Sequence, residues 1–461
     1  MKILEKYLEI ESREELYEFV FSHKDTLMYP FIRFRLLQSA LEATCGIPSP
    51  YDPLHFGNVQ KLKYITKSFL YTPNKQTRAT IVFFGSDVSN ICKENAYFNR
   101  LTESFANEYP SETILFEASD KMDYKRPRTY PNVFAKDFVK ITARFKSILK
   151  SVNSEDLDKI DSFINFLKNH FNNELNDIIF WELKKSLIRF VKELPFLFDE
   201  YIKLIKKLTP KIIFLEDACY GEGSIPLIMA AKELKIPIGE FQHGLISLTH
   251  PAYNYSDKLL DNYKFYMPEF YMSYGEYWTK NSRLPIKVVN VGNPYLSETT
   301  QRHDKGQKKE LLLYVSSAIT PEQYVKEVIY LNRKMADTEC SVVFRIHPSE
   351  SHRLQNVYKP IVDAGITVDT QPLYETLKHS KYVIGDISTT LFEAPLFDCI
   401  TFVKDTPYNR ENLDISYFNS CSSVEKLVEN IRSKNFKKTD SNSFWSENWR
   451  IKYHQLIDSY L

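Results

Sequence analysis

Apolar residues near the start of the chain are spaced three and four apart, which is the period of an amphipathic helix. Leu16, Phe19 and Val20 follow this spacing, and Pro30 is well placed to begin a further helix. We therefore expect a helical N-terminal segment over residues 1–75.

Continuous apolar runs of strand length appear next, at 79–84 and 113–117. They stop in the stretch 135–208, where Lys-rich amphipathic patterns predict helices. Strand-like runs return at 211–215 and 236–241, separated by a helical stretch. Two strands joined by a helix form a βαβ unit, so the sheet is predicted to be parallel.

The second half of the chain repeats this alternation of strands and helices. The strands expected there are 287–291, 311–315, 341–346, 366–368, 382–384 and 400–403. We expect a first Rossmann-like domain over 76–265 with the helical stretch inserted in it, a second over 266–440, and a C-terminal helix, 441–461, that returns to the first domain. Two such domains facing a cleft make the α/β architecture called GT-B.

Length and charge agree with this picture. A chain of 461 residues exceeds what one hydrophobic core usually serves, and a net charge of +1 argues against a nucleic-acid partner. Six scattered cysteines without a CxxC pair are typical of reduced thiols, and neither a signal peptide nor a transmembrane run is evident. We expect a cytoplasmic protein. Peripheral attachment to the inner face of a membrane stays open, for example through the helix around Lys203, Lys206 and Lys207, although a solvated face is the commoner explanation.

The segment 343–350 has the most distinctive chemistry, because a buried strand ends in charged groups. Arg345 can offer a bidentate fork to phosphate, His347 can donate to a phosphate oxygen, Pro348 stiffens the turn, and Glu350 follows. Ligands of open α/β sheets bind at this edge of the strands. The alternative is a capped strand end with a surface histidine.

A second strand passes through small hydroxyl residues into a helix at 384–393. Ser388, Thr389 and Thr390 can add hydroxyl donors to the free N–H groups of a helix start, and Glu393 can accept hydrogen bonds from a ribose. The alternative is an ordinary helix cap made by Asp386 or Ser388.

In the first domain, the segment 239–255 follows a strand and is predicted to face the cleft. His243 can act as a base or bind a donor phosphate, beside Gln242, Gly244 and Tyr253. The alternative role of His243 is to hold the loop in place.

Acids at strand ends are candidates for a general base. Glu216 and Asp217 follow one strand and precede a Gly-rich turn, and Asp87 follows another. Helix capping is the alternative role. The chain has neither a G-x-G-x-x-G fingerprint nor a P-loop, which disfavours a nicotinamide enzyme and a P-loop ATPase.

Three segments together resemble those of bacterial capsule and lipopolysaccharide glycosyltransferases of the GT-B fold. They read Glu-Phe-Gln-His-Gly at 240–244, Arg-Ile-His-Pro at 345–348 and Gly-Asp-Ile-Ser-Thr-Thr-Leu-Phe-Glu at 385–393. Similar patterns occur in Kdo transferases, in sialyl- and polysialyltransferases and in teichoic-acid glycerophosphotransferases. The resemblance implies that His347 and the turn 388–390 hold the donor's phosphates and that an acid of the first domain activates the acceptor. Ala218 departs from the sialyltransferase pattern, in which a glycine follows the paired acids.

The function predicted from the sequence is glycosyl transfer without metal or cofactor, from a nucleotide-sugar to a glycan or lipid-linked glycan of a surface polysaccharide. The base would be Asp217 or His243, with Glu216 and Asp87 as rivals. The alternatives are a CDP-polyol phosphotransferase of the teichoic-acid type, a sugar-nucleotide epimerase, and a non-catalytic glycan-binding component.

Overall fold

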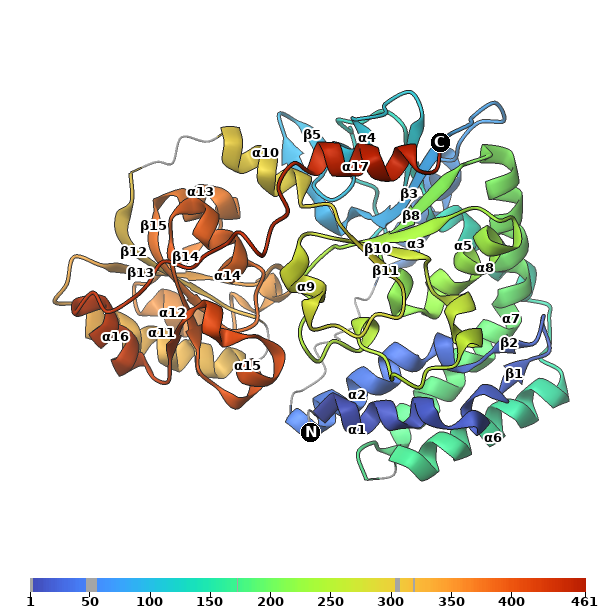
Figure 1. Cartoon of the computed structure of the whole chain (residues 1–461), viewed down its shortest axis with the longest axis horizontal. Helices are drawn as coiled ribbons and strands as arrows, with labels where there is room; N and C mark the ends of the chain where they lie inside the picture. Colours follow the sequence, from blue (N-terminus) through green and yellow to red (C-terminus); the bar gives the residue numbers. More distant parts are fainter. Residues whose placement is uncertain (1–2, 47–55, 172, 303–306, 318–319) are drawn as a thin grey trace.

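The computed structural model describes residues 3–46, 56–171, 173–302, 307–317 and 320–461. It contains two parallel sheets side by side, each with helices on its faces (Figure 1). The chain is therefore an α/β protein of GT-B-like architecture, with two Rossmann-like sheets.

The first sheet has seven parallel strands in the order β11-β10-β9-β8-β3-β6-β7. Their bounds are β3 Ile81–Ser86, β6 Thr113–Ala118, β7 Val133–Ala135, β8 Ile212–Leu215, β9 Ile238–Phe241, β10 Phe270–Ser273 and β11 Lys287–Asn290. Phe83 of the central strand lies beside Leu115 and Phe214 of its neighbours. All three are buried, because helices cover both faces of a parallel sheet and require apolar runs without alternation.

Strand β11 belongs to this first sheet and not to the second, where the sequence pattern had led us to expect it. Val289 of β11 lies beside Met272 of β10. The strand is an edge strand without a buried residue, so its pattern does not reveal which sheet it joins.

The second sheet has six parallel strands in the order β14-β13-β12-β15-β16-β17. Their bounds are β12 Lys309–Val315, β13 Ser341–Arg345, β14 Thr367–Asp369, β15 Ser380–Gly385, β16 Ile400–Lys404 and β17 Asn419–Cys421. The helices that accompany this sheet are α11 Pro321–Met335, α12 Lys359–Asp363, α13 Leu373–His379, α14 Thr390–Glu393, α15 Pro407–Asn412 and α16 Val424–Arg432.

Helices dominate the rest of the first half. They are α1 Ile3–Leu8, α2 Arg33–Cys45, α3 Asn58–Leu70, α4 Glu103–Ala106, α5 Asp137–Ser147, α6 Ser154–Phe171, α7 Asp177–Leu208 and α8 Ile225–Glu233. Two short hairpins interrupt them, β1 Val20–Phe21 with β2 Thr26–Leu27, and β4 Asn90–Lys93 with β5 Ala96–Asn99. No helix of the described ranges is long and apolar enough to cross a membrane.

The β1-β2 hairpin corrects the expectation of continuous helix around Val20. Lys24 and Asp25 have positive φ angles of 55° and 48°, so the chain turns back on itself there. Phe21 is fully buried in the hairpin, because the tight turn directs it into the core that the N-terminal helices share with the first sheet.

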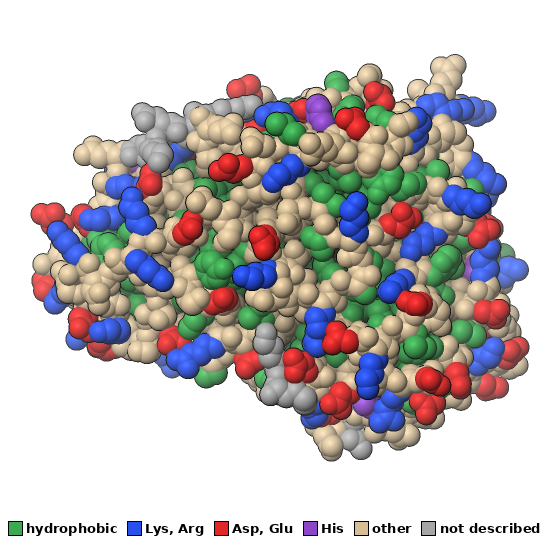
Figure 2. Space-filling model, in the orientation of Figure 1, with side chains coloured by type: hydrophobic (Ala, Val, Ile, Leu, Met, Phe, Trp, Pro, Cys, Tyr) green, Lys and Arg blue, Asp and Glu red, His purple; other side chains and the backbone are tan. Residues whose placement is uncertain are grey.

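Helix α9, Glu276–Lys280, joins β10 to β11 within the first sheet, and the chain passes to the second sheet through α10, Pro294–Arg302, before it returns at its end. Helix α17, Trp449–Asp458, lies over the first sheet (Figure 1, red). Trp449 and Tyr453 pack on Phe105, with ring centroids 5.6 and 4.7 Å away. Basic and acidic side chains are interspersed over the face shown in Figure 2, in keeping with the near-neutral net charge.

Candidate functional site

The carboxyl edge of the first sheet brings together the acids and the histidine named from the sequence. Asp87 follows β3, Glu216 and Asp217 follow β8, and Gln242 and His243 follow β9. Because these strands are parallel neighbours, their carboxyl ends lie at one edge of the sheet.

Glu216 is buried at this edge, against the backbone of β3. A Cβ atom on Gly85 would lie 2.9 Å from Oε2 of Glu216, so glycine makes room for the carboxylate. Burial and, to a smaller extent, the negative charge of Asp217 raise the pKa of Glu216 to about 8, and Lys136 opposes the shift. Glu216 is therefore largely protonated at neutral pH and is better suited to donate a proton than to accept one.

Asp217, in contrast, is exposed and faces a chain of ring groups. Its Oδ1 lies 3.8 Å from Nδ1 of His243. The Nε2 of His243 is 3.4 Å from the hydroxyl of Tyr220, which in turn lies 3.1 Å from Nε2 of His250. Burial lowers the pKa of His250 to about 3, so this second imidazole is neutral. The arrangement orients His243 between a carboxylate and a phenol.

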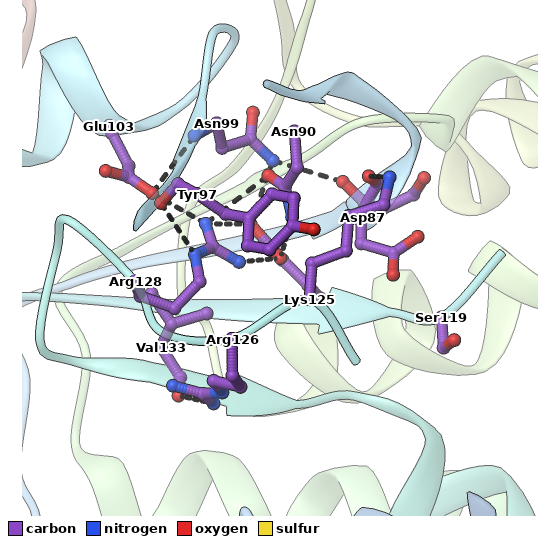
Figure 3. A network of polar contacts seen from close by, with 12 residues as sticks. Asp87, Asn90, Tyr97, Asn99, Glu103, Ser119, Lys125, Arg126, Arg128 and Val133 are labelled. Carbon is purple, nitrogen blue, oxygen red and sulfur yellow. Dashed lines mark hydrogen bonds and ion pairs between the residues drawn. The ribbon is translucent and has the colours of Figure 1, made fainter. Parts of the chain in front are cut away.

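Asp87 lies deeper, beside a buried ionic network (Figure 3). Arg128 pairs with Glu103 at 2.6 Å and with Glu117. The Oδ1 of Asp87 accepts the N–H of Asp120 at 2.9 Å, whereas Oδ2 accepts no hydrogen bond from any described residue. Burial raises the pKa of Asp87 to about 6, which keeps it a rival base close to neutral pH.

In the second sheet, the end of β13 places Arg345 and His347 differently. Arg345 is paired with Asp369 and donates to the carbonyl of Gln371 at 2.9 Å, so a phosphate would have to compete for its guanidinium. His347 has an exposed side chain, and its backbone N–H donates to Oγ of Ser316 at 2.8 Å. The surrounding protein lowers the pKa of His347, although Glu350 opposes this. Pro348 begins a short 3₁₀ turn, and its side chain lies outside the described part of the structure.

Glu350, for which the sequence predicts a donor-binding role, is engaged by the protein itself. It is buried and accepts hydrogen bonds from the Ser316 hydroxyl at 2.7 Å, the Tyr358 hydroxyl at 2.6 Å and Arg353 at 3.1 Å. A carboxylate whose oxygens are both engaged by the protein holds the turn together. Glu350 is therefore a structural residue.

Asp386 is engaged by the protein in the same way. It is buried, accepts from the side-chain amide of Asn409 at 2.8 Å, and lies 3.2 Å from Nζ of Lys404. Its oxygens bind the chain that follows β16 and are turned away from solvent. Asp386 thus secures the loop after β15, and its donor-binding role stays a prediction.

The hydroxyl turn after β15 leads into a shorter helix than expected. Helix α14 has four residues and continues as a 3₁₀ turn. Oγ of Ser388 accepts the N–H of Thr390 at 3.3 Å, which favours the capping role, and the carbonyl of Thr389 accepts from Glu393. Thr390 is buried, whereas Ser388 and Thr389 are partly exposed.

Residues around His243 mostly hold the loop in shape. Gln242 is buried and accepts the N–H of Tyr274 at 2.8 Å, while its amide donates to the carbonyl of Gly244 at 2.8 Å. Tyr253 is buried and donates to Glu240 at 2.9 Å, so it does not line a cleft as predicted. A Cβ on Gly244 would meet open space, so no protein atom crowds this side of the loop.

The same loop contacts the second sheet's loops directly. The N–H of Leu248 donates to the carbonyl of Asn412 at 2.9 Å, and Thr249 is bonded to the Asn412 side chain. Asn412 lies on α15 with Asn409, the residue that binds Asp386. The loop after β9 and the loop after β15 therefore lie on the same side of the molecule.

Tyr274 and Arg100 were not singled out from the sequence, yet they connect the two edges. Burial raises the pKa of the Tyr274 hydroxyl, nearby Arg100 lowers it, and the carboxylates of Glu393 and Glu216 raise it. One tyrosine thus lies within electrostatic reach of an acid from each sheet. The position of Tyr274 directly after β10 could have revealed it, whereas Arg100, beyond a hairpin, carries no motif.

Glu393 is buried beside this tyrosine. Burial raises the pKa of Glu393, whereas Arg100, a hydrogen bond with Tyr374 and Arg345 lower it. Arg100 is exposed and belongs to the first half of the chain. The candidate site therefore combines a cation of one sheet's loops with an acid of the other's.

Comparison with known proteins gives likenesses of structure only. No family model matches the sequence, and no curated protein matches it. A UDP-GlcNAc 2-epimerase from Methanocaldococcus jannaschii is similar at 11% identity and a TM-score of 0.48, over 83% of this chain and 99% of that one. The wall teichoic acid polymerase TagF, in a variant form, is similar at 11% identity and a TM-score of 0.45, over 92% and 98%. A Neisseria meningitidis UDP-GlcNAc 2-epimerase bound to UDP-GlcNAc is similar at 12% identity and a TM-score of 0.41, over 82% of this chain and 98% of that one.

Proposed function

We propose that the chain transfers a sugar from a nucleotide-activated donor to a glycan acceptor of a surface polysaccharide, at the place where the two carboxyl edges meet. One observation carries this proposal. The loop after β9, which carries His243, is hydrogen-bonded to the second half of the chain, where the carbonyl of Asn412 accepts the N–H of Leu248 at 2.9 Å. A donor held by one sheet would therefore reach an acceptor held by the other.

The second sheet would bind the donor. His347, exposed at the end of β13, would donate to a phosphate oxygen, and the partly exposed Ser388 and Thr389 would contribute from the neighbouring loop. Glu393 would accept from the ribose. Arg100 would approach the leaving phosphate from the first half of the chain, where a guanidinium stabilises the charge that develops as the glycosidic bond breaks.

The first sheet would activate the acceptor through Asp217. Its carboxylate would take the proton of the acceptor hydroxyl while the hydroxyl oxygen bonds to the anomeric carbon and the nucleotide phosphate leaves with the bonding electrons. Asp217 is the exposed member of the pair at the end of β8, whereas Glu216 is buried and largely protonated at neutral pH. His243, 3.8 Å from Asp217, is the next candidate.

The first experiment identifies the donor. Thermal-shift screening against CMP, CDP, UDP and GDP and their sugar conjugates finds the nucleotide, because a ligand of the folded state stabilises it by mass action. The selected donor is then incubated with and without glycan acceptors, and the products are weighed by mass spectrometry. A glycosylated acceptor supports the proposal. Conversion of the donor in the absence of acceptor would show that the protein is a sugar-nucleotide epimerase. Transfer of a polyol phosphate would show that it is a phosphotransferase of the teichoic-acid type. Nucleotide binding without turnover would show that it is a non-catalytic binding component.

The second experiment identifies the base. Asp217→Asn should lower turnover by about a hundred- to ten-thousandfold with nucleotide affinity retained. Glu216→Gln, His243→Ala and Asp87→Asn serve as comparisons in the same assay. If Asp217→Asn retains near-normal turnover, Asp217 is not the general base. The base would then be the residue whose substitution causes the large loss of turnover.

A further inference from the structure

Helix α3 carries an apolar stripe that points away from the protein. Val59, Leu62, Phe69 and Leu70 are spaced at helical intervals and are all exposed, Val59 and Leu70 each at 70%. A surface helix normally turns such a stripe towards the core. Here the stripe is left without a partner among the described residues.

The opposite side of α3 is the side that packs on the protein. Ser68 is its one buried residue, and its hydroxyl is bonded to the hydroxyl of Tyr124 at 2.8 Å. Tyr64 is stacked with the same ring at a centroid distance of 6.1 Å. The helix is therefore anchored by hydroxyl and aromatic groups, and this anchoring fixes the direction of its apolar stripe.

The end of α5 extends the apolar area. Phe145, Ile148 and Leu149 are exposed, Leu149 at 94%. Ala135, just before α5, donates to the carbonyl of Tyr71, just after α3. Burial raises the pKa of Tyr64 of α3, Asp137 of α5 raises it further, and Arg144 of α5 lowers it. The two helices therefore lie side by side and antiparallel.

Lysines border these apolar residues. Helix α3 contains Lys61, Lys63 and Lys67 and no acidic residue, and Lys146 and Lys150 lie at the end of α5. Lys67 pairs with Asp123 and Lys146 with Glu200, each at 2.5 Å, whereas Lys61 and Lys63 are exposed. We call this combined area the α3–α5 surface, defined by Val59, Leu62, Phe69, Leu70, Phe145, Ile148 and Leu149 with these lysines.

We propose that the α3–α5 surface docks on an anionic lipid bilayer, with α3 lying in the plane of the interface. Outward apolar side chains would enter the acyl boundary while the lysines contact anionic headgroups. A second copy of the chain fits less well, because a two-fold interface would place the acid-free, lysine-bearing α3 against itself. Like charges facing one another oppose such pairing.

The lysine cluster at the end of α7 is a poorer membrane contact. Lys203 pairs with Glu200 at 2.9 Å, and Lys207 donates to the carbonyl of Pro73 at 2.9 Å. The apolar residues at the end of α7 are buried, so this end of the helix has no outward apolar side chains beside its lysines, unlike the α3–α5 surface. The membrane contact is therefore assigned to α3 and the end of α5.

Sedimentation with lipid vesicles tests the proposal on the full chain without any donor or acceptor. Wild-type protein should bind vesicles of phosphatidylglycerol and phosphatidylcholine, and binding should weaken on pure phosphatidylcholine and at about 0.5 M salt, where surface charges are screened. Leu62→Gln combined with Leu70→Gln should lower the partition coefficient about tenfold or more, because two leucine side chains no longer enter the bilayer. Lys61→Gln combined with Lys63→Gln should reduce the preference for anionic vesicles.

Matched substitutions at other exposed apolar positions are the control. Ile451→Gln on α17 combined with Val362→Gln on α12 should bind vesicles as the wild type does. Failure of the wild type to bind anionic vesicles, or equal binding by the leucine variant, would overturn the proposal. Ultracentrifugation supplies a further refutation: a wild-type dimer that the leucine variant converts to a monomer would show that the surface pairs with a second copy.

Discussion

Replacement of Glu216 by glutamine should stabilise the protein at alkaline pH. The carboxyl is buried against Gly85, and its pKa is raised to about 8 by burial and then by the charge of Asp217. Glutamine has nearly the shape of a protonated glutamate and cannot ionise. The substitution therefore removes the cost of a buried charge and retains an oxygen that can accept a hydrogen bond.

The direction of the pH dependence follows from proton linkage. The usual pKa of a glutamate is 4.5, which is the value expected in the unfolded chain, and the folded value is higher. Between these two values the folded protein binds more protons than the unfolded chain, so the contribution of Glu216 to stability falls as pH rises. It is fully present below pH 4.5 and lost by about pH 8.

The size of the effect has an upper limit set by one titrating group. Each pH unit within the window costs at most about 1.4 kcal/mol, and sharing of protons with Asp217 reduces this. For a domain of this size, about 1 kcal/mol corresponds to about 2–4 °C in the melting temperature. The melting temperature of Glu216→Gln should therefore rise relative to wild type with increasing pH, by at most about 3–6 °C per unit between pH 6 and pH 8.

The assay is thermal unfolding of both proteins at several pH values, with Glu447→Gln as the matched control. Glu447 is exposed, so the same loss of charge there should change the melting temperature little. A constant difference between Glu216→Gln and wild type would contradict the raised pKa. A difference that shrinks as pH rises would show that the folded protein stabilises the ionised form.

Four other substitutions test the donor side and the N-terminal helices. His347→Ala should weaken nucleotide binding by about ten- to a hundredfold with the melting temperature unchanged, because a charge-assisted hydrogen bond contributes about 1.5–3 kcal/mol; equal affinity by calorimetry would remove this residue from the site. Ser388→Ala should weaken nucleotide binding less, since backbone N–H groups remain; a lower melting temperature with unchanged affinity would leave it only its capping role. Arg33→Met should lower the free energy of unfolding by about 3–5 kcal/mol, because it leaves the carboxylate of Glu11, 2.6 Å away, buried without its cation. Arg35→Met is the control, because it breaks a more exposed ion pair with Glu182 and should lower the free energy of unfolding by about 0–1 kcal/mol. Equal losses of unfolding free energy for Arg33→Met and Arg35→Met in denaturant would contradict the role of burial.

The apolar runs of the sequence are sufficient to predict most strands and their parallel direction. The run Ile81–Phe84 lacks polar alternation because both faces of its sheet are covered, and the same holds for Ile212–Leu215. The carboxyl ends of such strands are the general place for ligands. For this reason the sequence also places Asp217 and His243 at one edge.

Periodicity could not determine which elements come together. Strand β11 shows the same pattern whether it joins the first sheet or the second, and only pairing with β10 decides. The spacing of apolar residues in α3 predicts an amphipathic helix but not that its stripe faces outward, which depends on the contacts of Tyr64 and Ser68 with Tyr124.

The state of each candidate acid was likewise a tertiary property. The sequence places Glu350 and Asp386 next to strand ends just as it places Asp217, yet the first two are enclosed by donors from other segments and the third is exposed. Arg100, from the first half of the chain, lowers the pKa of Glu393 only because folding brings the two sheets side by side (Figure 1). Local sequence determines which groups stand at a strand end, whereas burial and hydrogen-bond partners, which decide whether a group can act on a ligand, come from residues distant in the chain.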